Sequence, residues 1–235
     1  MAEALTSADH VVDELFVTPA AAERERDVLR VAAADDVRIT LVSDRVAAAL
    51  SDTVTPQGIV AVVRARTGSL DAVLRRNPRL VAVLVGAADP GNAGTVIRTA
   101  DAAGADAVVL TGESVDPHNP KSVRASAGSL FHLPVVRVAD TSAVLDALRA
   151  AQLSVAATTL DPQAEDLESA SVQRRLAAPI AWVFGNEAHG LADDIVAGAD
   201  LRIRIPIFGR AESLNLAAAA AICLYASARA QRAAG

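Results

Sequence analysis

From residue 80 onward, short and almost continuously apolar segments alternate with longer segments that have helical periodicity. Strands that are apolar at every position are buried on both faces, and strands separated by helices are joined by crossovers that make them parallel. This alternation predicts an α/β fold with one parallel sheet and helices on both of its faces. The expected strands span 80–85, 107–110, 135–138, 154–158, 180–184 and 201–206.

A second, smaller α/β domain is expected ahead of this sheet. Residues 1–66 alternate short helical stretches with apolar runs typical of strands, at 14–18, 38–43 and 58–63. The stretch 67–79 contains turn residues, among them Gly68, Asn77 and Pro78. The sequence therefore predicts a first domain over 1–66, a linker over 67–79 and a second domain over 80–235.

The composition indicates in which cellular compartment the protein resides and whether it binds a metal ion. The N-terminus has an early acidic residue and no apolar run that fits a signal peptide, and no charge-free stretch reaches the roughly 18 residues of a membrane span. We therefore expect a cytoplasmic protein without a membrane segment. The 4 histidines and the single Cys223 show no metal-ligand spacing, so no metal site is expected, and Cys223 is interpreted as a buried small hydrophobe.

The net charge of -6 counts against nucleic-acid binding by electrostatics alone, because basic surfaces supply most non-specific affinity.

The last predicted helix, 214–232, is apolar nearly all the way round as far as Ala226. A helix without a polar face must be buried on more than one side. Either the fold wraps this helix completely or a second copy of the chain covers it, and for a domain of this size we predict the second, a homodimer.

A first polar constellation follows the strand at 80–85. The loop after this strand opens a helix, where backbone amides and the helix dipole favour anions. The residues match neither the P-loop nor the dinucleotide fingerprint, so neither ATP nor NAD is supported. Asn92 and Arg98 are candidate ligand contacts, and the alternative for Arg98 is an exposed ion pair with Asp101 at i,i+3.

Two further constellations stand at later strand ends. Gly185 permits a sharp turn where open α/β sheets bind ligands, and Glu187 either contacts a substrate or is only a helix-terminal charge. His189 is interpreted as a solvated loop residue. After the strand at 201–206, Ser213 is predicted to cap the last helix, and Asn215 is predicted to lie just inside it, where a buried amide needs partners.

These three blocks, in this order and spacing, resemble the TrmH/SpoU branch of the SPOUT family of S-adenosylmethionine-dependent RNA 2′-O-ribose methyltransferases. The likeness covers residues 80–232 and rests on Asn92-Ala-Gly-Thr-Val-Ile-Arg98, Phe184-Gly-Asn-Glu-Ala-His-Gly-Leu191 and Ile205-Pro-Ile-Phe-Gly-Arg-Ala-Glu-Ser-Leu-Asn215. It implies a SPOUT domain whose C-terminal segment threads a loop as a deep trefoil knot, a rare exception to unknotted topology.

The resemblance also implies roles for individual residues. S-adenosylmethionine would be held largely by backbone groups at Gly185, Ile205 and Leu214. Arg98 and Asn92 correspond to the family's catalytic pair, with Arg98 acting across the dimer interface, and the supporting polar residues are Glu187, Ser213 and Asn215. The segment 119–129 is also similar to the family's, and its Lys121 and Arg124 are expected to contact RNA, although they equally suit an exposed turn.

Residues 11–63 resemble, more weakly, the ribosomal-protein-like substrate-binding domain that many of these enzymes carry. Family members usually begin with a strand that ends in a Glu-Gly pair, whereas here the chain starts directly at Ala2. The first strand of that domain is therefore expected to be missing or replaced.

Together these observations predict an RNA ribose methyltransferase that uses S-adenosylmethionine. Its expected substrate is ribosomal RNA, most readily 23S ribosomal RNA, ahead of transfer RNA. The alternative from another functional class is a non-catalytic RNA-binding or ribosome-assembly protein that keeps the knotted cofactor fold. An unrelated nucleotide-dependent enzyme is disfavoured by the failed P-loop and dinucleotide patterns.

Overall fold

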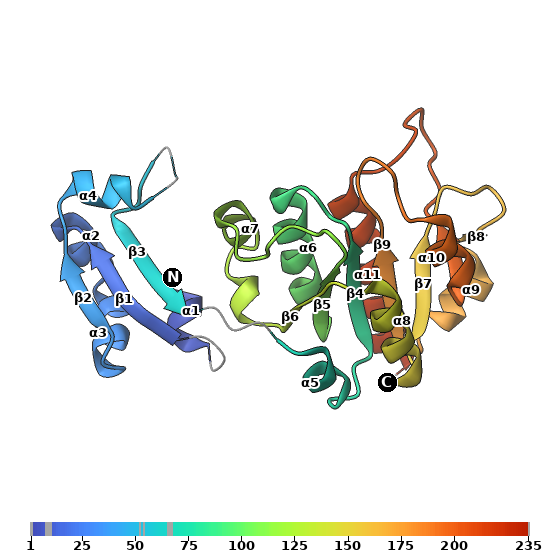
Figure 1. Ribbon diagram of the computed structural model, residues 1–235, viewed down its shortest axis with the longest axis horizontal. Coiled ribbons are helices and arrows are strands. Elements are labelled where there is room, and N and C mark those ends of the chain that lie inside the picture. Colours follow the sequence, from blue (N-terminus) through green and yellow to red (C-terminus); the bar gives the residue numbers. More distant parts are fainter. Residues whose placement is uncertain (1, 8–10, 52, 54, 65–67, 235) are drawn as a thin grey trace. The chain divides into compact units, whose positions relative to one another are not determined.

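A computed structural model of the chain describes residues 2–7, 11–51, 53, 55–64 and 68–234. The chain divides into two compact units, Met1–Arg66 and Thr67–Gly235, which Figure 1 colours along the sequence.

The first unit contains a three-stranded sheet in the order β2-β1-β3. Strand β1 (Val11–Val17) pairs in parallel with β2 (Arg38–Leu41) and antiparallel with β3 (Ile59–Arg64), so all three predicted strands are present. Leu15 and Val17 of the central strand are fully buried. The helices of this unit are α1 (Ala2–Thr6), α2 (Pro19–Arg24), α3 (Arg26–Ala34) and α4 (Asp44–Ala49).

The second unit is built on a seven-stranded sheet in the order β6-β5-β4-β9-β7-β10-β8, and every pairing in it is parallel. The predicted parallel α/β fold is confirmed. The strands are β4 (Leu80–Val85), β5 (Ala107–Thr111), β6 (Val135–Val138), β7 (Ser154–Thr158), β8 (Glu165–Asp166), β9 (Ile180–Phe184) and β10 (Leu201–Arg204).

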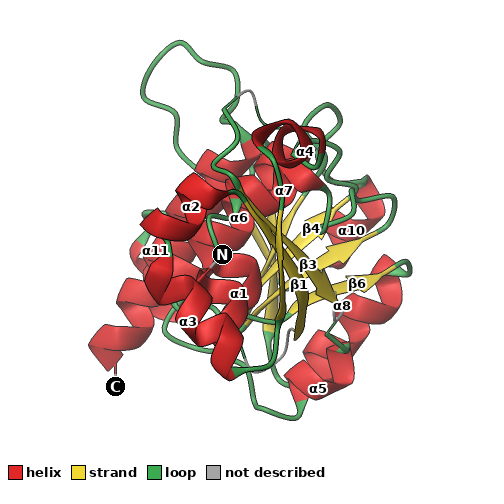
Figure 2. Cartoon of the chain, turned by 90° about the vertical axis from the view of Figure 1, so that its left-hand side faces the viewer, coloured by secondary structure: helices red, strands yellow, loops and turns green. Residues whose placement is uncertain are grey.

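Helices cover both faces of this sheet, as Figure 2 shows for α6 and α11 on one side and α5, α8 and α10 on the other. Alternate residues of β4 supply the two cores: Leu80, Ala82 and Leu84 face the α6 and α11 layer, and Val81 and Val83 face the α8 layer. The helices are α5 (Leu70–Leu74), α6 (Pro90–Ala103), α7 (Pro120–Ala125), α8 (Thr141–Ala150), α9 (Ala170–Arg175), α10 (Asp193–Gly198) and α11 (Leu216–Ala234).

Three details differ from the sequence prediction. The segment expected as a linker over 67–79 belongs to the second unit, because it forms α5 and buries Val73 in the α8-side core. Strand β10 ends at Arg204 rather than residue 206, since Pro206 cannot donate a ladder hydrogen bond. Strand β8 was not predicted because two acidic residues give no apolar signal.

The trefoil knot stays a prediction. Within the described residues, each helix is too short or too polar to cross a bilayer.

Helices α6 and α7 approach each other very closely at Gly94. A Cβ atom placed on Gly94 would lie 2.3 Å from the Ser122 carbonyl oxygen and 2.7 Å from the Ala125 Cβ. The contact is tied by a hydrogen bond of 2.8 Å from the buried Ser122 hydroxyl to the Pro90 carbonyl oxygen. This approach holds the first turn of α6 in place.

We expect Gly94→Ala to lower the free energy of unfolding of the second unit by about 1–3 kcal/mol, because the added methyl group has no space. Gly198→Ala is the matched control, since a Cβ there meets no atom within 4 Å. Urea unfolding followed by the fluorescence of Trp182, the chain's 1 tryptophan, reports this unit directly. Equal midpoints for the two variants would contradict the packing argument.

Candidate active site

Loops from four neighbouring strands meet at one edge of the second sheet. Because β4, β9, β7 and β10 are adjacent and parallel, their carboxyl ends lie at the same edge. This edge, where strand order reverses about β4, is where open α/β sheets form ligand crevices.

The loop after β9 folds back on itself. Asn186 and Gly190 form an antiparallel bridge, with N–H to oxygen distances of 3.0 and 2.8 Å. A Cβ on Gly185 would lie 2.1 Å from the Gly190 carbonyl carbon, and Gly190 itself has φ +69°. The Asn186 side chain then donates to the Gly86 carbonyl oxygen at 2.6 Å, which fastens this loop to the loop after β4.

Glu187 lies at the N-terminus of α6. Its carboxylate accepts hydrogen bonds from the backbone N–H groups of Ala88 (3.2 Å) and Asp89 (3.4 Å) and from the Asn92 amide (2.9 Å). Partial burial acts to raise the pKa of Glu187, but these hydrogen bonds outweigh it and hold the pKa below its ordinary value. Glu187 is therefore ionised at neutral pH, and it contacts a helix other than the one that follows it.

The side-chain amides of Asn92 and Asn215 can each match the hydrogen-bond donors and acceptors around them in only one orientation. The Glu187 carboxylate only accepts, so the Asn92 amino group faces it. The Asn92 oxygen then accepts from the Asn215 amino group at 3.0 Å. The Asn215 oxygen accepts from the backbone N–H groups of Ala217 (2.9 Å) and Ala218 (3.3 Å). A single hydrogen-bonded chain thus joins the loops after β9 and β10 to the first turn of α6.

The predicted cap of the last helix was wrong. Helix α11 begins at Leu216, and Asn215 caps it instead of Ser213, because the Asn215 oxygen accepts from the first turn. Asn215 is therefore outside the helix and exposed, not buried within it. Ser213 is exposed and lines a cavity beside the loop after β9.

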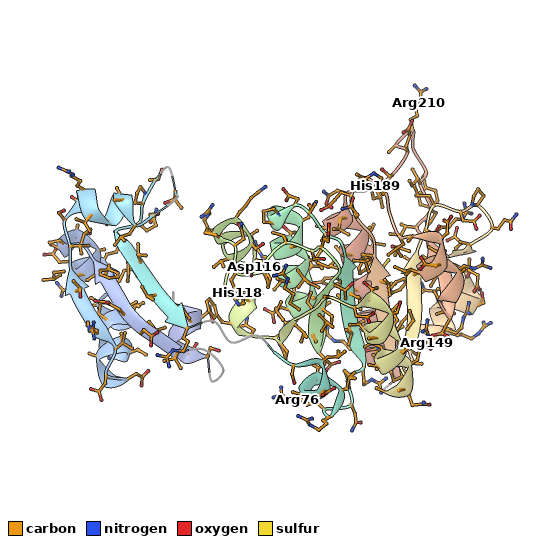
Figure 3. All side chains as sticks on the ribbon, viewed as in Figure 1. Arg76, Asp116, His118, Arg149, His189 and Arg210 are labelled. Carbon is orange, nitrogen blue, oxygen red and sulfur yellow. The ribbon has the colours of Figure 1, made fainter. Side chains whose placement is uncertain are left out.

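A cavity of about 400 Å³ opens beside this network. Gly185, Ile205 and Leu214 all line it, together with Glu187 and His189. Figure 3 shows His189 at this end of the sheet. The remaining lining residues are Thr158, Thr159, Leu160, Phe184, Asn186, Ala188, Gly190, Leu191, Val196, Ile207, Ser213, Leu216 and Ala219.

Arg98 does not join the network. Its side chain is exposed on α6 and makes no hydrogen bond or ion pair within the part of the chain that the structure describes. The alternative pairing with Asp101 is not formed, because the Asp101 carboxylate contacts the His132 ring nitrogen at 2.8 Å. Arg98 stands six positions after Asn92, about 9 Å along the helix axis and on another face.

Lys121 has a structural partner. Its ammonium donates to the Asp89 carboxylate at 2.7 Å, and this contact is the main cause that lowers the pKa of Asp89. Asp89 in turn caps α6 by accepting from the Asn92 backbone N–H at 2.8 Å. Arg124 is exposed on α7. Lys121 thus bridges α7 to the start of α6, and just over half of its side chain stays accessible.

Other candidate groups take no part in the site. Cys223 is buried in the core beside α6, and burial raises the pKa of its thiol, so it packs as a small hydrophobe. Among the described residues, no three histidine, cysteine, aspartate or glutamate side chains lie together as a metal-binding group.

The positioning residues Asp89 and Asn186, and the cavity wall at 158–160, were not predicted from the sequence. Asp89 precedes Pro90, which is a helix-start signal that was available. Residues 158–160 line the cavity because β7 pairs with β9 in parallel, which brings the carboxyl end of β7 next to that of β9. No local sequence pattern reveals this pairing.

The fold and this site define a class: parallel α/β proteins that bind a ligand in a cavity at the carboxyl ends of their strands, beside an acid–amide network. Residues 79–225 match the model of the SpoU rRNA Methylase family, and residues 2–68 match the model for RNA 2′-O ribose methyltransferase substrate binding. The chain belongs to the SpoU rRNA methylase family, which confirms the resemblance seen in the sequence.

Similarity to relatives, in sequence and in structure, extends over nearly the whole chain. The chain is 35% identical over 228 residues to the 23S rRNA (guanosine(2553)-2′-O)-methyltransferase RlmP of Bacillus subtilis, covering 94% of this chain and 86% of that protein. The structure is similar to the AdoMet-bound SpoU methyltransferase AviRb of Streptomyces viridochromogenes, with TM-score 0.80, 30% identity and coverage of 96% and 85%. An AdoMet-bound rRNA methyltransferase from Sinorhizobium meliloti gives TM-score 0.79, 31% identity and coverage of 97% and 82%.

Two substitutions at Asn215 separate its two contacts. Asn215→Ala removes the cap, and we expect it to lower the free energy of unfolding by about 1 kcal/mol. Asn215→Asp keeps the capping oxygen but cannot donate to Asn92, so it should lose less stability. Urea unfolding followed by Trp182 fluorescence measures both variants, and equal losses would show that capping is not the stabilising contact.

Proposed function

We propose that this chain transfers a methyl group from S-adenosylmethionine to the ribose 2′-hydroxyl of a nucleotide in ribosomal RNA, most readily 23S ribosomal RNA. The observation that carries the proposal is the hydrogen-bonded chain Glu187–Asn92–Asn215 at the edge of the cavity, in a member of this family. Relatives named as 23S rRNA 2′-O-methyltransferases favour ribosomal over transfer RNA. With that substrate, the compartment we propose is the cytoplasm.

The cavity suits the cofactor. Its volume of about 400 Å³ lies within the range of small-molecule sites, and its wall combines apolar side chains such as Leu191 and Ile205 with a glycine, Gly185. Gly185 lines the cavity without a side chain, and its Cβ position is filled by the backbone of Gly190, so it can offer a ligand only backbone groups. We propose Gly185, Ile205 and Leu214 as cofactor contacts. Bound there, S-adenosylmethionine supplies an electrophilic methyl group.

The polar chain would orient the nucleophile. Asn92 uses one N–H for Glu187 and one oxygen lone pair for Asn215, which leaves one donor and one acceptor for a ribose hydroxyl. Because Glu187 and Asn215 fix the Asn92 amide, no reorganisation of this side chain is needed during reaction. Ser213 lies on the cavity wall and is proposed as a further polar contact.

Arg98 is proposed to clamp a phosphate of the target nucleotide and to stabilise the oxygen that loses its proton. A guanidinium stays protonated, so Arg98 serves as an electrostatic group rather than a base. Lys121 and Arg124 are proposed RNA contacts at the neighbouring helix, where Arg124 is exposed and Lys121 is partly held by Asp89.

A homodimer would bring Arg98 of one copy to the site of the other. Arg98 lies outside the hydrogen-bonded network of its own chain, on α6, which packs beside α11. The outer face of α11 exposes Ile222 (42%) and Tyr225 (47%). We propose that a second copy covers this face and completes the site.

The test of the reaction is transfer of labelled methyl groups from S-adenosylmethionine to unmodified ribosomal and transfer RNA fractions. We expect alkali-resistant 2′-O-methyl label in ribosomal RNA, and at least about a 100-fold lower rate for Arg98→Ala. Thermal stabilisation by S-adenosylmethionine should persist in that variant. Cofactor binding without label in either fraction would instead favour the non-catalytic RNA-binding alternative.

Mixing two inactive variants tests whether Arg98 acts across the dimer. In a mixed dimer of Arg98→Ala and Asn92→Ala, one site would combine the intact Asn92 of one copy with the intact Arg98 of the other. Equal mixing should make half of the dimers mixed and restore about a quarter of the wild-type sites. No recovery in coexpressed and separately tagged dimers would place Arg98 in its own chain's site.

A further inference from the structure

Exposed large apolar side chains of the second unit occur in two places among the described residues. Ile222 and Tyr225 lie on the outer face of α11, and the others, Leu160 (66%), Phe208 (87%) and Leu214 (37%), lie at or beside the cavity. Phe208 is the most exposed of all of them. Single exposed hydrophobic residues are common, so exposure alone does not indicate a binding role for Phe208. Its position in the fold is what suggests one.

Phe208 lies where the chain leaves the cavity wall. The loop between β10 and α11 lines the cavity with Ile205 and Ile207 on one stem and with Ser213 and Leu214 on the other. Between the stems, residues 208–212 are all exposed. Figure 3 shows Arg210 at the tip of this loop, with its side chain directed away from the sheet.

No contact within the described chain explains this aromatic ring. Residues 205–213 make no hydrogen bond to the rest of the described residues, and the observed aromatic pair, Trp182 with Phe184, lies inside the core. A Cβ on Gly209 would meet no atom within 4 Å, so the loop is open on that side as well. The ring therefore contributes little to folding.

We propose that Phe208 is a stacking platform for an RNA base that neighbours the methylated nucleotide. This inference rests on the proposed function. Unstacked bases of single-stranded RNA bind aromatic side chains through their π-faces, and such stacking tolerates many sequences. A ring at the cavity rim would hold the strand so that the adjacent ribose enters the site.

The charges of the loop support stacking over simple electrostatic attraction. Arg210 can contact a phosphate, but Glu212 follows it, so the loop tip has no net positive charge. Phe208 is not part of the cavity wall, unlike Ile207. Its loss should therefore weaken RNA binding and leave cofactor binding unchanged.

Substitutions at Phe208 test the proposal in the full-length protein. Binding is measured to a mixed-sequence single-stranded oligoribonucleotide and to the duplex of the same sequence. Phe208→Ala and Phe208→Leu should bind the single strand at least about fivefold more weakly, and Phe208→Tyr should match the wild type within about twofold. Duplex binding should not change.

Kinetics and salt dependence sharpen the test. For methyl transfer, Phe208→Ala should raise KM for RNA and leave the KM for S-adenosylmethionine unchanged. Its binding should keep the wild-type salt dependence, whereas Arg210→Ala should lower the slope of log affinity against log salt by about 0.7, as expected for one lost contact to single-stranded RNA.

Four outcomes would overturn the proposal. Full RNA affinity in Phe208→Leu would show a contact that needs no π-face, and full affinity in Phe208→Ala would show no contact at all. Weaker cofactor binding would place Phe208 in the cavity instead, and a shift from dimer to monomer would make the loop a contact between copies. Because oligonucleotide binding needs no methyl transfer, an inactive wild type would contradict the proposed function and not this inference.

Discussion

The hydrogen-bonded chain from Glu187 through Asn92 to Asn215 is the interaction on which the arrangement of the site depends. Glu187 and Asn215 belong to the loops after β9 and β10, and Asn92 belongs to the first turn of α6. The carboxylate at one end and the helix N–H groups at the other set the orientation of both amides. The loops after β4, β9 and β10 therefore cannot move independently without leaving polar groups unpaired. This arrangement holds the Asn92 side chain in one amide orientation and leaves one N–H and one oxygen lone pair of that amide unused.

Glycines give this network its geometry. Gly185 lets the loop after β9 fold against Gly190, and that fold carries Glu187 back to the start of α6. Gly94 lets α7 approach the same helix, where Lys121 binds the capping carboxylate of Asp89. Because both positions lack space for a methyl group, the site is supported by close backbone packing as well as by side-chain hydrogen bonds.

The two faces of α6 serve different purposes in the proposed enzyme. Its first turn is tied to Glu187, while Arg98 further along points to another side and finds no partner in its own chain among the described residues. An exposed arginine on α6 and exposed apolar side chains on the neighbouring α11 fit the proposal that two copies complete the site together. The loop that carries Phe208 would then act on the RNA strand, separately from the cavity proposed to hold the cofactor.

Local patterns in the sequence determined the parallel α/β class, six strands of the main sheet and the family, because apolar periodicity and short motifs depend on residues close together in the chain. They also singled out Asn92, Glu187 and Asn215. Tertiary structure alone decided that Asn215 rather than Ser213 caps α11, that 67–79 forms part of the second unit, and that Lys121 pairs with Asp89. The Lys121–Asp89 and Asn215–Asn92 hydrogen bonds join side chains 32 and 123 positions apart, and Val73 packs into a core formed by distant strands. Only the folded sheet brings these residues together, so no pattern of neighbouring residues reveals them.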